Sequence, residues 1–85
     1  MGEPVVRNTM RVQRAIRDLT QADLAERAGI TRASVNAIEG GRMVPSIYLA
    51  LKLARALEVP VDELFSLSAA APVGGSSESG RRPAG

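Results

Sequence analysis

The side chains that most enzymes use for chemistry are either missing from this sequence or scattered along it. Its 85 residues include no cysteine and no histidine. Thiolate nucleophiles, imidazole bases and the usual zinc sites, which take sulfur or imidazole ligands, are therefore excluded. The carboxylates are spread out, and no pair is evidently held in a cleft: Asp18, Asp23, Glu26, Glu58, Asp62 and Glu63. We expect a protein that is not an enzyme and that carries no metal and no cofactor.

The side chains with an informative spacing lie in residues 21–40, which read QADLAERAGITRASVNAIEG. Apolar residues recur there on either side of Gly29: Leu24, Ala28, Ile30, Val35 and Ile38. Within each half the spacing is three or four, which places the residues on one face of a helix. Gly29 permits the positive φ that a sharp turn needs. Two short helices joined by a short turn containing glycine form a helix-turn-helix, so this stretch predicts that motif.

Capping and breaking residues predict the ends of five helices. Asn8 or Thr9 can cap a first helix that runs to about Asp18, and Thr20 can cap a second, with Asp23 placing negative charge in its first turn. The second helix ends at Gly29, and Thr31 caps a third helix over residues 32–39, which Gly40 and Gly41 end. Pro45 and Ser46 begin a fourth helix over residues 47–57. Residues 61–65 form a short fifth helix. No comparable segment alternates with period two, so we expect an all-α fold.

The composition divides the chain into three parts. Residues 1–7 are expected to form a flexible N-terminal arm, and residues 8–67 the folded domain. Residues 68–85, SAAAPVGGSSESGRRPAG, are expected to form a disordered tail, because they hold too little apolar surface to offset the entropy of ordering. No apolar run approaches the ~18 residues of a membrane helix, and the beginning lacks the apolar stretch of a signal peptide. We therefore expect a soluble cytoplasmic protein that does not contact a membrane.

Two stretches of the sequence resemble a known family: TQADLAERAGITRASVNAIEGGR, and then PSIYLALKLARALEVPVDELF. They are similar to the XRE-type helix-turn-helix transcriptional regulators, which are related to the phage repressor and Cro proteins. The resemblance covers Asn8 to Phe65. It implies a compact five-helix, lambda-repressor-like domain whose third helix enters the major groove of DNA. The positions that match the family pattern are Gln21, Ala25, Gly29, Ile38, Glu39 and Gly41.

The third predicted helix carries the candidates for contact with DNA bases. Because Val35 and Ile38 point inward, its outward face holds Arg32, Ala33, Asn36 and Ala37. An arginine can fork onto the O6 and N7 atoms of guanine, and an asparagine can pair with adenine or bind a phosphate. The small alanines let the backbone approach the groove, and Ala33 can touch a thymine methyl group. Without the motif, the same face would be an ordinary solvated helix surface.

The resemblance also implies contacts to the DNA backbone. In the family, a glutamine at the start of the second helix binds a phosphate with help from the helix N-terminus, which implies that role for Gln21. Thr31, Ser34 and Arg42 flank the reading helix and are further candidates for phosphate contacts. Thr31 can alternatively serve only as a helix cap.

Two further interactions are expected, one within the chain and one between copies of it. Relatives pair an arginine of the first helix with a glutamate at the end of the third, which implies a structural ion pair between Arg14 and Glu39. A single module of this kind reads only a few base pairs, and specific binding usually comes from a two-fold dimer on two half-sites. The apolar cluster at the end of the domain, Leu64, Phe65 and Leu67, is where we expect the dimer contact.

These features predict a sequence-specific regulator that binds double-stranded DNA, a repressor acting as a homodimer on a palindromic operator. The net charge of +2 and the isoelectric point of about 9.9 agree with this function but are weak evidence by themselves. The alternative is a protein-binding module, such as an antitoxin-like or regulatory subunit, whose main partner is another protein. Salt-dependent affinity for DNA, against stoichiometric capture of a protein partner, distinguishes the two.

Overall fold

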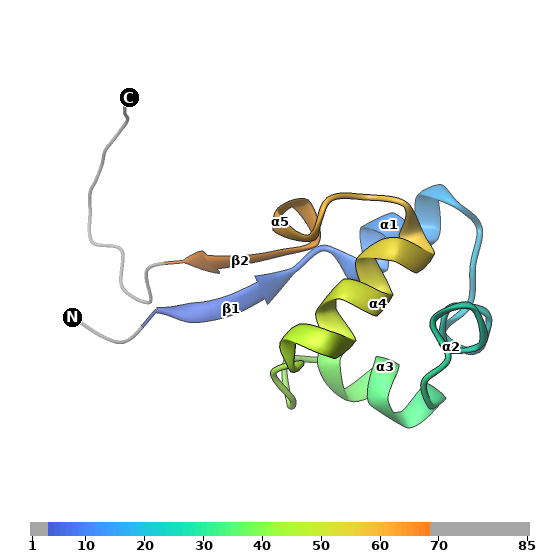
Figure 1. The fold of residues 1–85 in the computed structure, drawn as a ribbon, viewed down its shortest axis with the longest axis horizontal. Coiled ribbons are helices and arrows are strands. Elements are labelled where there is room, and N and C mark those ends of the chain that lie inside the picture. The colour runs from blue at the N-terminus through green and yellow to red at the C-terminus, as the bar shows by residue number, and fades with distance from the viewer. Residues whose placement is uncertain (1–3, 69–85) are drawn as a thin grey trace.

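The computed structural model describes residues 4–68, which form five helices and a two-stranded sheet. In chain order the elements are β1 (Val5–Asn8), α1 (Met10–Ile16), α2 (Gln21–Ala28), α3 (Arg32–Glu39), α4 (Ile47–Leu57), α5 (Val61–Leu64) and β2 (Phe65–Ser68). The helices gather into one body, and the two strands extend from it as a ribbon (Figure 1). The predicted spans of α3 and α4 are confirmed.

The caps around the helix-turn-helix form as the residue types predict. The hydroxyl of Thr20 accepts from the backbone N–H of Asp23, and the Asp23 carboxylate accepts from the backbone N–H of Thr20, each at 3.0 Å. Gly29 ends α2 with a φ of 72°, which is left-handed and costs a glycine little. Thr31 then caps α3 by accepting from the N–H of Ser34 at 3.0 Å. These contacts satisfy backbone donors that would otherwise lack partners, so they fix where α2 ends and α3 begins.

The first helix is shorter than its sequence suggests. α1 ends at Ile16, and the chain turns at Asp18, which has a left-handed φ of 57°. At the other end, the side chain of Asn8 accepts from the N–H of Met10 at 3.0 Å, so Asn8 rather than Thr9 supplies the capping side chain.

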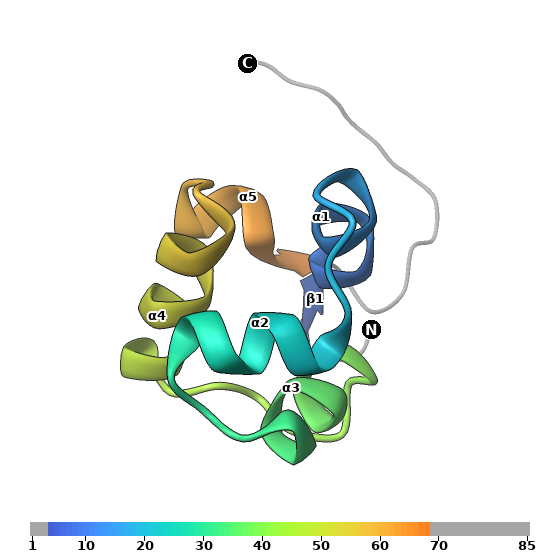
Figure 2. The ribbon, with the colours of Figure 1, turned by 90° about the vertical axis from the view of Figure 1, so that its right-hand side faces the viewer.

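The core takes side chains from all five helices. Its ten buried apolar residues are Met10, Leu24, Ala25, Ala28, Val35, Ile38, Leu53, Ala54, Leu57 and Leu64. α1, α2, α4 and α5 surround this core, and α3 lies across α2 at one end of the molecule (Figure 2). Among residues 4–68 no polar or charged residue is buried as a whole. The apolar residues whose spacing predicted the helix-turn-helix are thus largely the ones that α2 and α3 bury in the core.

The two strands correct the expectation of an all-α fold. β1 and β2 pair antiparallel, with Val5 opposite Ser68 and Asn8 opposite Phe65. Each strand has only four residues, too few for a period-two pattern to stand out. The two strands lie at opposite ends of the folded sequence, so no local sequence pattern predicts that they pair.

The ribbon also changes the boundaries of the domain. Residues 5–7, expected in a flexible arm, and Ser68, expected in a tail, are strand residues. The rest of the expected tail, residues 69–85, lies outside the described residues. The ladder continues toward the helices, because the N–H of Thr9 donates to the carbonyl of Leu64 at 3.0 Å. The ribbon thereby fastens the start of α1 to the end of α5.

Candidate nucleic-acid interface

α3 turns one side to the core and the other to solvent. Val35 and Ile38 are 0% and 1% exposed, as their spacing predicts. The four predicted base-contact residues lie elsewhere on the helix: Arg32, Ala33 and Asn36 are exposed, and Ala37 is half-buried. Three of the four are therefore accessible to a ligand along the length of the helix.

Residues of α2 and α3 meet in a shallow hollow on this surface. Gln21, at the first position of α2, lines the hollow together with Arg32, Ala33 and Asn36 of α3. The structure thus brings one predicted phosphate-contact residue beside three predicted base-contact residues. Ala33 contributes only a methyl group to the lining of the hollow.

The remaining predicted phosphate contacts border α3 at its two ends. At the start of the helix, the hydroxyl of Thr31 accepts from the Ser34 N–H and donates to the Ser34 hydroxyl at 2.9 Å, so it serves as a cap. Beyond the end of α3, the guanidinium of Arg42 folds back and donates to the side-chain carbonyl of Asn36. A Cβ atom at Gly40 would lie 2.6 Å from the Arg42 Nη1 atom, so the glycine leaves space for this guanidinium.

A buried ion pair joins α1 to the end of α3. Arg14 donates from Nε to Glu39 Oε2 at 2.8 Å and from Nη2 to Glu39 Oε1 at 2.9 Å, and its Nη1 donates to the carbonyl of Leu19 at 2.9 Å. The exposed fractions of the two side chains are 15% for Arg14 and 3% for Glu39. The paired geometry matches the planar fork of an arginine to both oxygens of a carboxylate. The pair expected from the family resemblance is present, and it fixes the end of α3 against α1.

Glu39 also contacts the hollow. Its Oε1 atom accepts from the Nε2 atom of Gln21 at 2.7 Å, and the Oε1 atom of Gln21 accepts from the Nδ2 atom of Asn36 at 3.1 Å. Burial raises the pKa of Glu39, but the hydrogen bonds from Arg14 and Gln21 lower it more, so this pKa lies below its ordinary value of 4.5. The hydrogen bond to Glu39 raises the pKa of Arg14, which burial opposes. Both groups are therefore charged at neutral pH.

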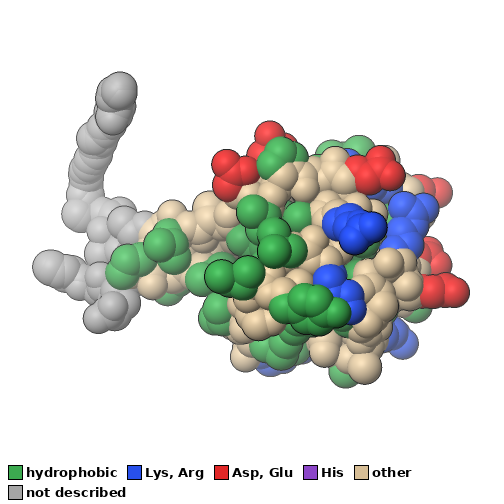
Figure 3. Space-filling view, viewed as in Figure 1, with side chains coloured by type: hydrophobic (Ala, Val, Ile, Leu, Met, Phe, Trp, Pro, Cys, Tyr) green, Lys and Arg blue, Asp and Glu red, His purple; other side chains and the backbone are tan. Residues whose placement is uncertain are grey.

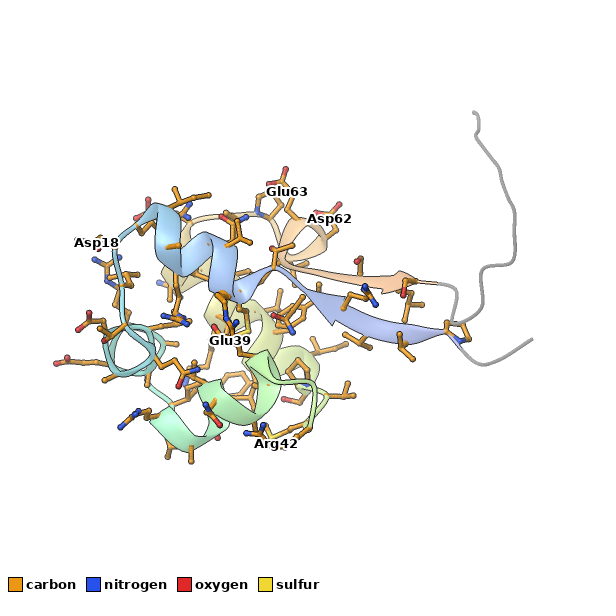
Figure 4. The ribbon with its side chains drawn as sticks, turned by 180° about the vertical axis from the view of Figure 1, so that it is seen from behind. Asp18, Glu39, Arg42, Asp62 and Glu63 are labelled. Atoms are coloured by element: carbon orange, nitrogen blue, oxygen red, sulfur yellow. The ribbon has the colours of Figure 1, made fainter. Side chains whose placement is uncertain are left out.

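The acidic residues of α5 lie away from α3. Asp62 and Glu63 on α5 project from the edge of the molecule opposite α3, whereas Arg42 lies at the α3 end (Figure 4). A negatively charged ligand that approaches α3 therefore meets Arg32 and Arg42 and avoids the carboxylates of α5.

The sequence matches known proteins over most of the folded unit. Residues 10–64 match the model of the helix-turn-helix family. An HTH-type transcriptional regulator of Methanocaldococcus jannaschii is 38% identical over 60 residues, covering 71% of this chain and 91% of the relative. The HTH-type transcriptional regulator YgzD of Bacillus subtilis is 39% identical over 62 residues, covering 73% of this chain and 94% of the relative.

A solved structure extends the likeness to the fold. The restriction-modification controller protein C.AhdI from Aeromonas hydrophila superposes with a TM-score of 0.63 at 38% identity, covering 66% of this chain and 85% of that chain. The chain belongs to the XRE-type helix-turn-helix family. Members of this family are DNA-binding transcriptional regulators and not enzymes. Within residues 4–68, no helix has the length and apolar composition needed to cross a membrane.

The three residues predicted for a dimer contact, on α5 and β2, do not share one environment. Leu64 is 0% exposed and packs in the core, so it is not available to a second copy of the chain. Leu64 is the last residue of α5 and its side chain points into the core, which the run of apolar residues in the sequence does not show. Phe65 is half-buried against the core, and Leu67 on β2 is 70% exposed. The dimer-interface prediction is corrected at Leu64.

One feature of the helix-turn-helix surface does not follow from the residue types alone: Gln21 hydrogen-bonds both Glu39 and Asn36. A signal for it exists, because Asn36 and Glu39 are three residues apart and so lie on one side of α3. The spacing within α3 does not predict that Gln21 lies beside these two residues. That position depends on how α2 crosses α3, which only the packed structure defines.

Proposed function

We propose that this XRE-type protein is a sequence-specific repressor that inserts α3 into the major groove of duplex DNA. The observation that carries the proposal is the hollow in which Gln21, Arg32, Ala33 and Asn36 lie together. The major groove is wide enough for one helix, and arginine and asparagine are side chains that recognise base edges there. Arg32, Ala33, Asn36 and Ala37 face the bases in this proposal.

The proposed contacts to the DNA backbone flank the hollow. Gln21 stands at the N-terminus of α2, where the positive end of the helix dipole favours an anion. Arg42 lies beyond the other end of α3, and Thr31 and Ser34 lie at its start. Contacts of this kind fix the register of the protein on the duplex but carry no sequence information directly.

We place the homodimer contact on the apolar surface outside the core. Four of the exposed large apolar side chains fall within one stretch at the start of α4: Val44, Ile47, Tyr48 and Leu51. Apolar side chains also show on the ribbon, on the same face of the molecule (Figure 3). The ribbon carries the exposed Leu67 and the half-buried Phe65, and in this proposal a second copy covers both regions. Two copies then present two α3 helices to half-sites about one helical turn apart.

Repression is the simplest outcome of such binding, because a protein that occupies a promoter excludes RNA polymerase from it. In this proposal the protein acts in the cytoplasm on the DNA of a bacterium or phage, with no cofactor. The competing function is a protein-binding module that does not read DNA. The two differ in what the protein binds and in how salt affects binding.

Selection from a pool of random duplexes, followed by salt titration, tests this function. We expect enrichment of a two-fold-symmetric sequence, with log affinity falling linearly as log salt concentration rises, because phosphate contacts release counterions. Sedimentation of the complex should give two copies of the chain on each duplex. The absence of any enriched sequence at moderate salt would contradict the proposal and favour the protein-binding alternative.

Matched variants test the position of the dimer contact. Leu51→Ser and Leu67→Ser should shift the free protein toward monomer, because both side chains belong to the proposed contact surface. Val12→Ser is the control, since Val12 is 57% exposed on α1 and lies outside that surface. Equal effects of all three changes on the dimer fraction would contradict this placement.

A further inference from the structure

Asn36 is exposed on α3, yet both ends of its side-chain amide are engaged by neighbours. Its Nδ2 atom donates to Gln21 Oε1 at 3.1 Å, and its Oδ1 atom accepts from the Nη2 atom of Arg42. Gln21 in turn donates to Glu39 at 2.7 Å. A free asparagine can rotate and offer its donor and acceptor in either order. The contacts around Asn36 remove that freedom.

The direction of the hydrogen bonds from Glu39 through Gln21 and Asn36 to Arg42 is fixed at both ends of the series. The ionised carboxylate of Glu39 only accepts, so Gln21 turns its NH2 group toward Glu39 and its carbonyl toward Asn36. The guanidinium of Arg42 only donates, so it meets the carbonyl of Asn36. Both constraints select the same orientation of the Asn36 amide, with Nδ2 toward α2 and Oδ1 toward the segment after α3.

Each end of the series is itself held in place. Glu39 is locked by its two hydrogen bonds from Arg14, and its side chain is only 3% exposed. At the other end, the absence of a side chain at Gly40 lets Arg42 lie against α3. Figure 4 shows Glu39 between α1 and α3, and Arg42 at the far side of α3. This series of hydrogen bonds therefore connects the interior of the domain to the exposed surface of α3.

After these contacts, the amide of Asn36 keeps one N–H and one lone pair of Oδ1 unused. In the major groove, adenine presents an acceptor at N7 and a donor at N6, which match that pair, whereas guanine presents two acceptors. We propose that Gln21 is a positioning residue, which fixes the Asn36 amide so that Asn36 selects adenine over guanine at one position of each half-site. This inference rests on the proposed function. It adds to Gln21 a role in sequence preference beyond a phosphate contact.

Base-preference profiles of two variants test the positioning role. Gln21→Met keeps the length of the side chain but cannot donate to Glu39 and is at best a weak acceptor for Asn36. Its adenine-over-guanine preference at the Asn36 position should fall about tenfold, while preferences at other positions stay as in the wild type. Arg32→Ala is the matched control on the same surface. It should change a different position and leave the adenine preference intact.

A measurement on the free protein tests the fixed amide without DNA. In nitrogen-15 relaxation, the side-chain NH2 group of Asn36 should be ordered in the wild type and mobile in Gln21→Met. The NH2 group of Asn8 is an internal control, because it donates to the carbonyl of Ile38 at 3.1 Å and does not contact Gln21. Its order should be the same in both proteins.

The outcomes separate this inference from the function on which it rests. A wild-type Asn36 amide as mobile as that of Gln21→Met overturns the fixed orientation, whatever the DNA result. An enriched site whose adenine preference survives in Gln21→Met overturns the positioning role and leaves the proposed function standing. A pool in which the wild type enriches nothing overturns the proposed function together with the reading role of Asn36.

Discussion

The α2–α3 unit and the β1–β2 ribbon keep their structures by different means. In the α2–α3 unit, side-chain hydrogen bonds lead from Asn36 inward to the Arg14–Glu39 pair. In the ribbon, main-chain pairing holds the strands, and three large apolar side chains, Val5, Val6 and Leu67, are exposed. Single side-chain changes should therefore disturb stability or base preference in the α2–α3 unit. In the ribbon they should affect contacts with other molecules.

The junction between α5 and the ribbon gives the largest expected contrast. Leu64→Ala should lower the free energy of unfolding by about 3 kcal/mol, because Leu64 is 0% exposed and its truncation leaves a cavity. Leu67→Ala should change it by less than about 0.5 kcal/mol, because Leu67 is 70% exposed. Urea unfolding at a concentration where the protein is monomeric measures both. Equal losses would show that ribbon side chains pack as core residues do.

The ion pair should show the dependence of the α2–α3 unit on single side chains. Glu39→Ala leaves the guanidinium of Arg14, whose side chain is only 15% exposed, without its carboxylate partner, which should cost about 3 kcal/mol of unfolding free energy. Glu26→Ala removes an exposed carboxylate of α2 and should cost less than about 0.5 kcal/mol. Urea unfolding of the two variants under identical conditions makes the comparison. A loss in Glu39→Ala no larger than in Glu26→Ala would refute a structural role for the pair.

Base preference should respond to α3 and not to the ribbon. Arg32→Ala should remove about 1–3 kcal/mol of discrimination at one position of each half-site, because the variant cannot make the proposed bidentate contact to guanine. Ser66→Ala, on β2, should leave the profile unchanged. Random-duplex selection with each variant gives the profiles. An unchanged profile in Arg32→Ala would mean that another residue of the hollow reads that position.

The smallest expected effect is the dependence of stability on pH through Glu39. Because its pKa is lower in the folded protein than its ordinary value of 4.5, its charge stabilises the fold fully above that value. The contribution is lost as the pH falls through the lower folded-state pKa. Between about pH 5 and pH 3, the urea midpoint of the wild type should therefore fall more than that of Glu39→Gln. If the urea midpoints of the two proteins fell equally with pH, the loss of stability in acid would belong to other carboxylates.

The parts of the structure that sequence predicts are those whose causes are local. Thr20, Gly29 and Thr31 fix helix ends through neighbours within a few residues, and the apolar spacing of α3 fixes which side it buries. The ribbon depends on pairing between Val5–Asn8 and Phe65–Ser68, which lie far apart in the chain. Such pairing leaves no local pattern.

The candidate site divides in the same way. The outward position of Arg32 follows from the period of one helix, and the structure places it as the sequence predicts. The environment of Asn36 does not follow from any one helix, because its partners are Gln21 on α2 and Arg42 after α3. Leu64 and Leu67 look alike in sequence, but only the packing of α5 shows that one is buried.

The central claim is that α3 lies in the major groove while the acidic edge of α5 faces away from DNA. Because the chain contains no cysteine, a single introduced cysteine can carry an iron–EDTA cleavage reagent. Ala22→Cys places it on the exposed side of α2 next to Gln21, and Asp62→Cys places it on α5. The reagent at position 22 should cut the enriched duplex at two symmetric places, and the reagent at position 62 should not cut. Cleavage from position 62 but not from position 22 would contradict the account.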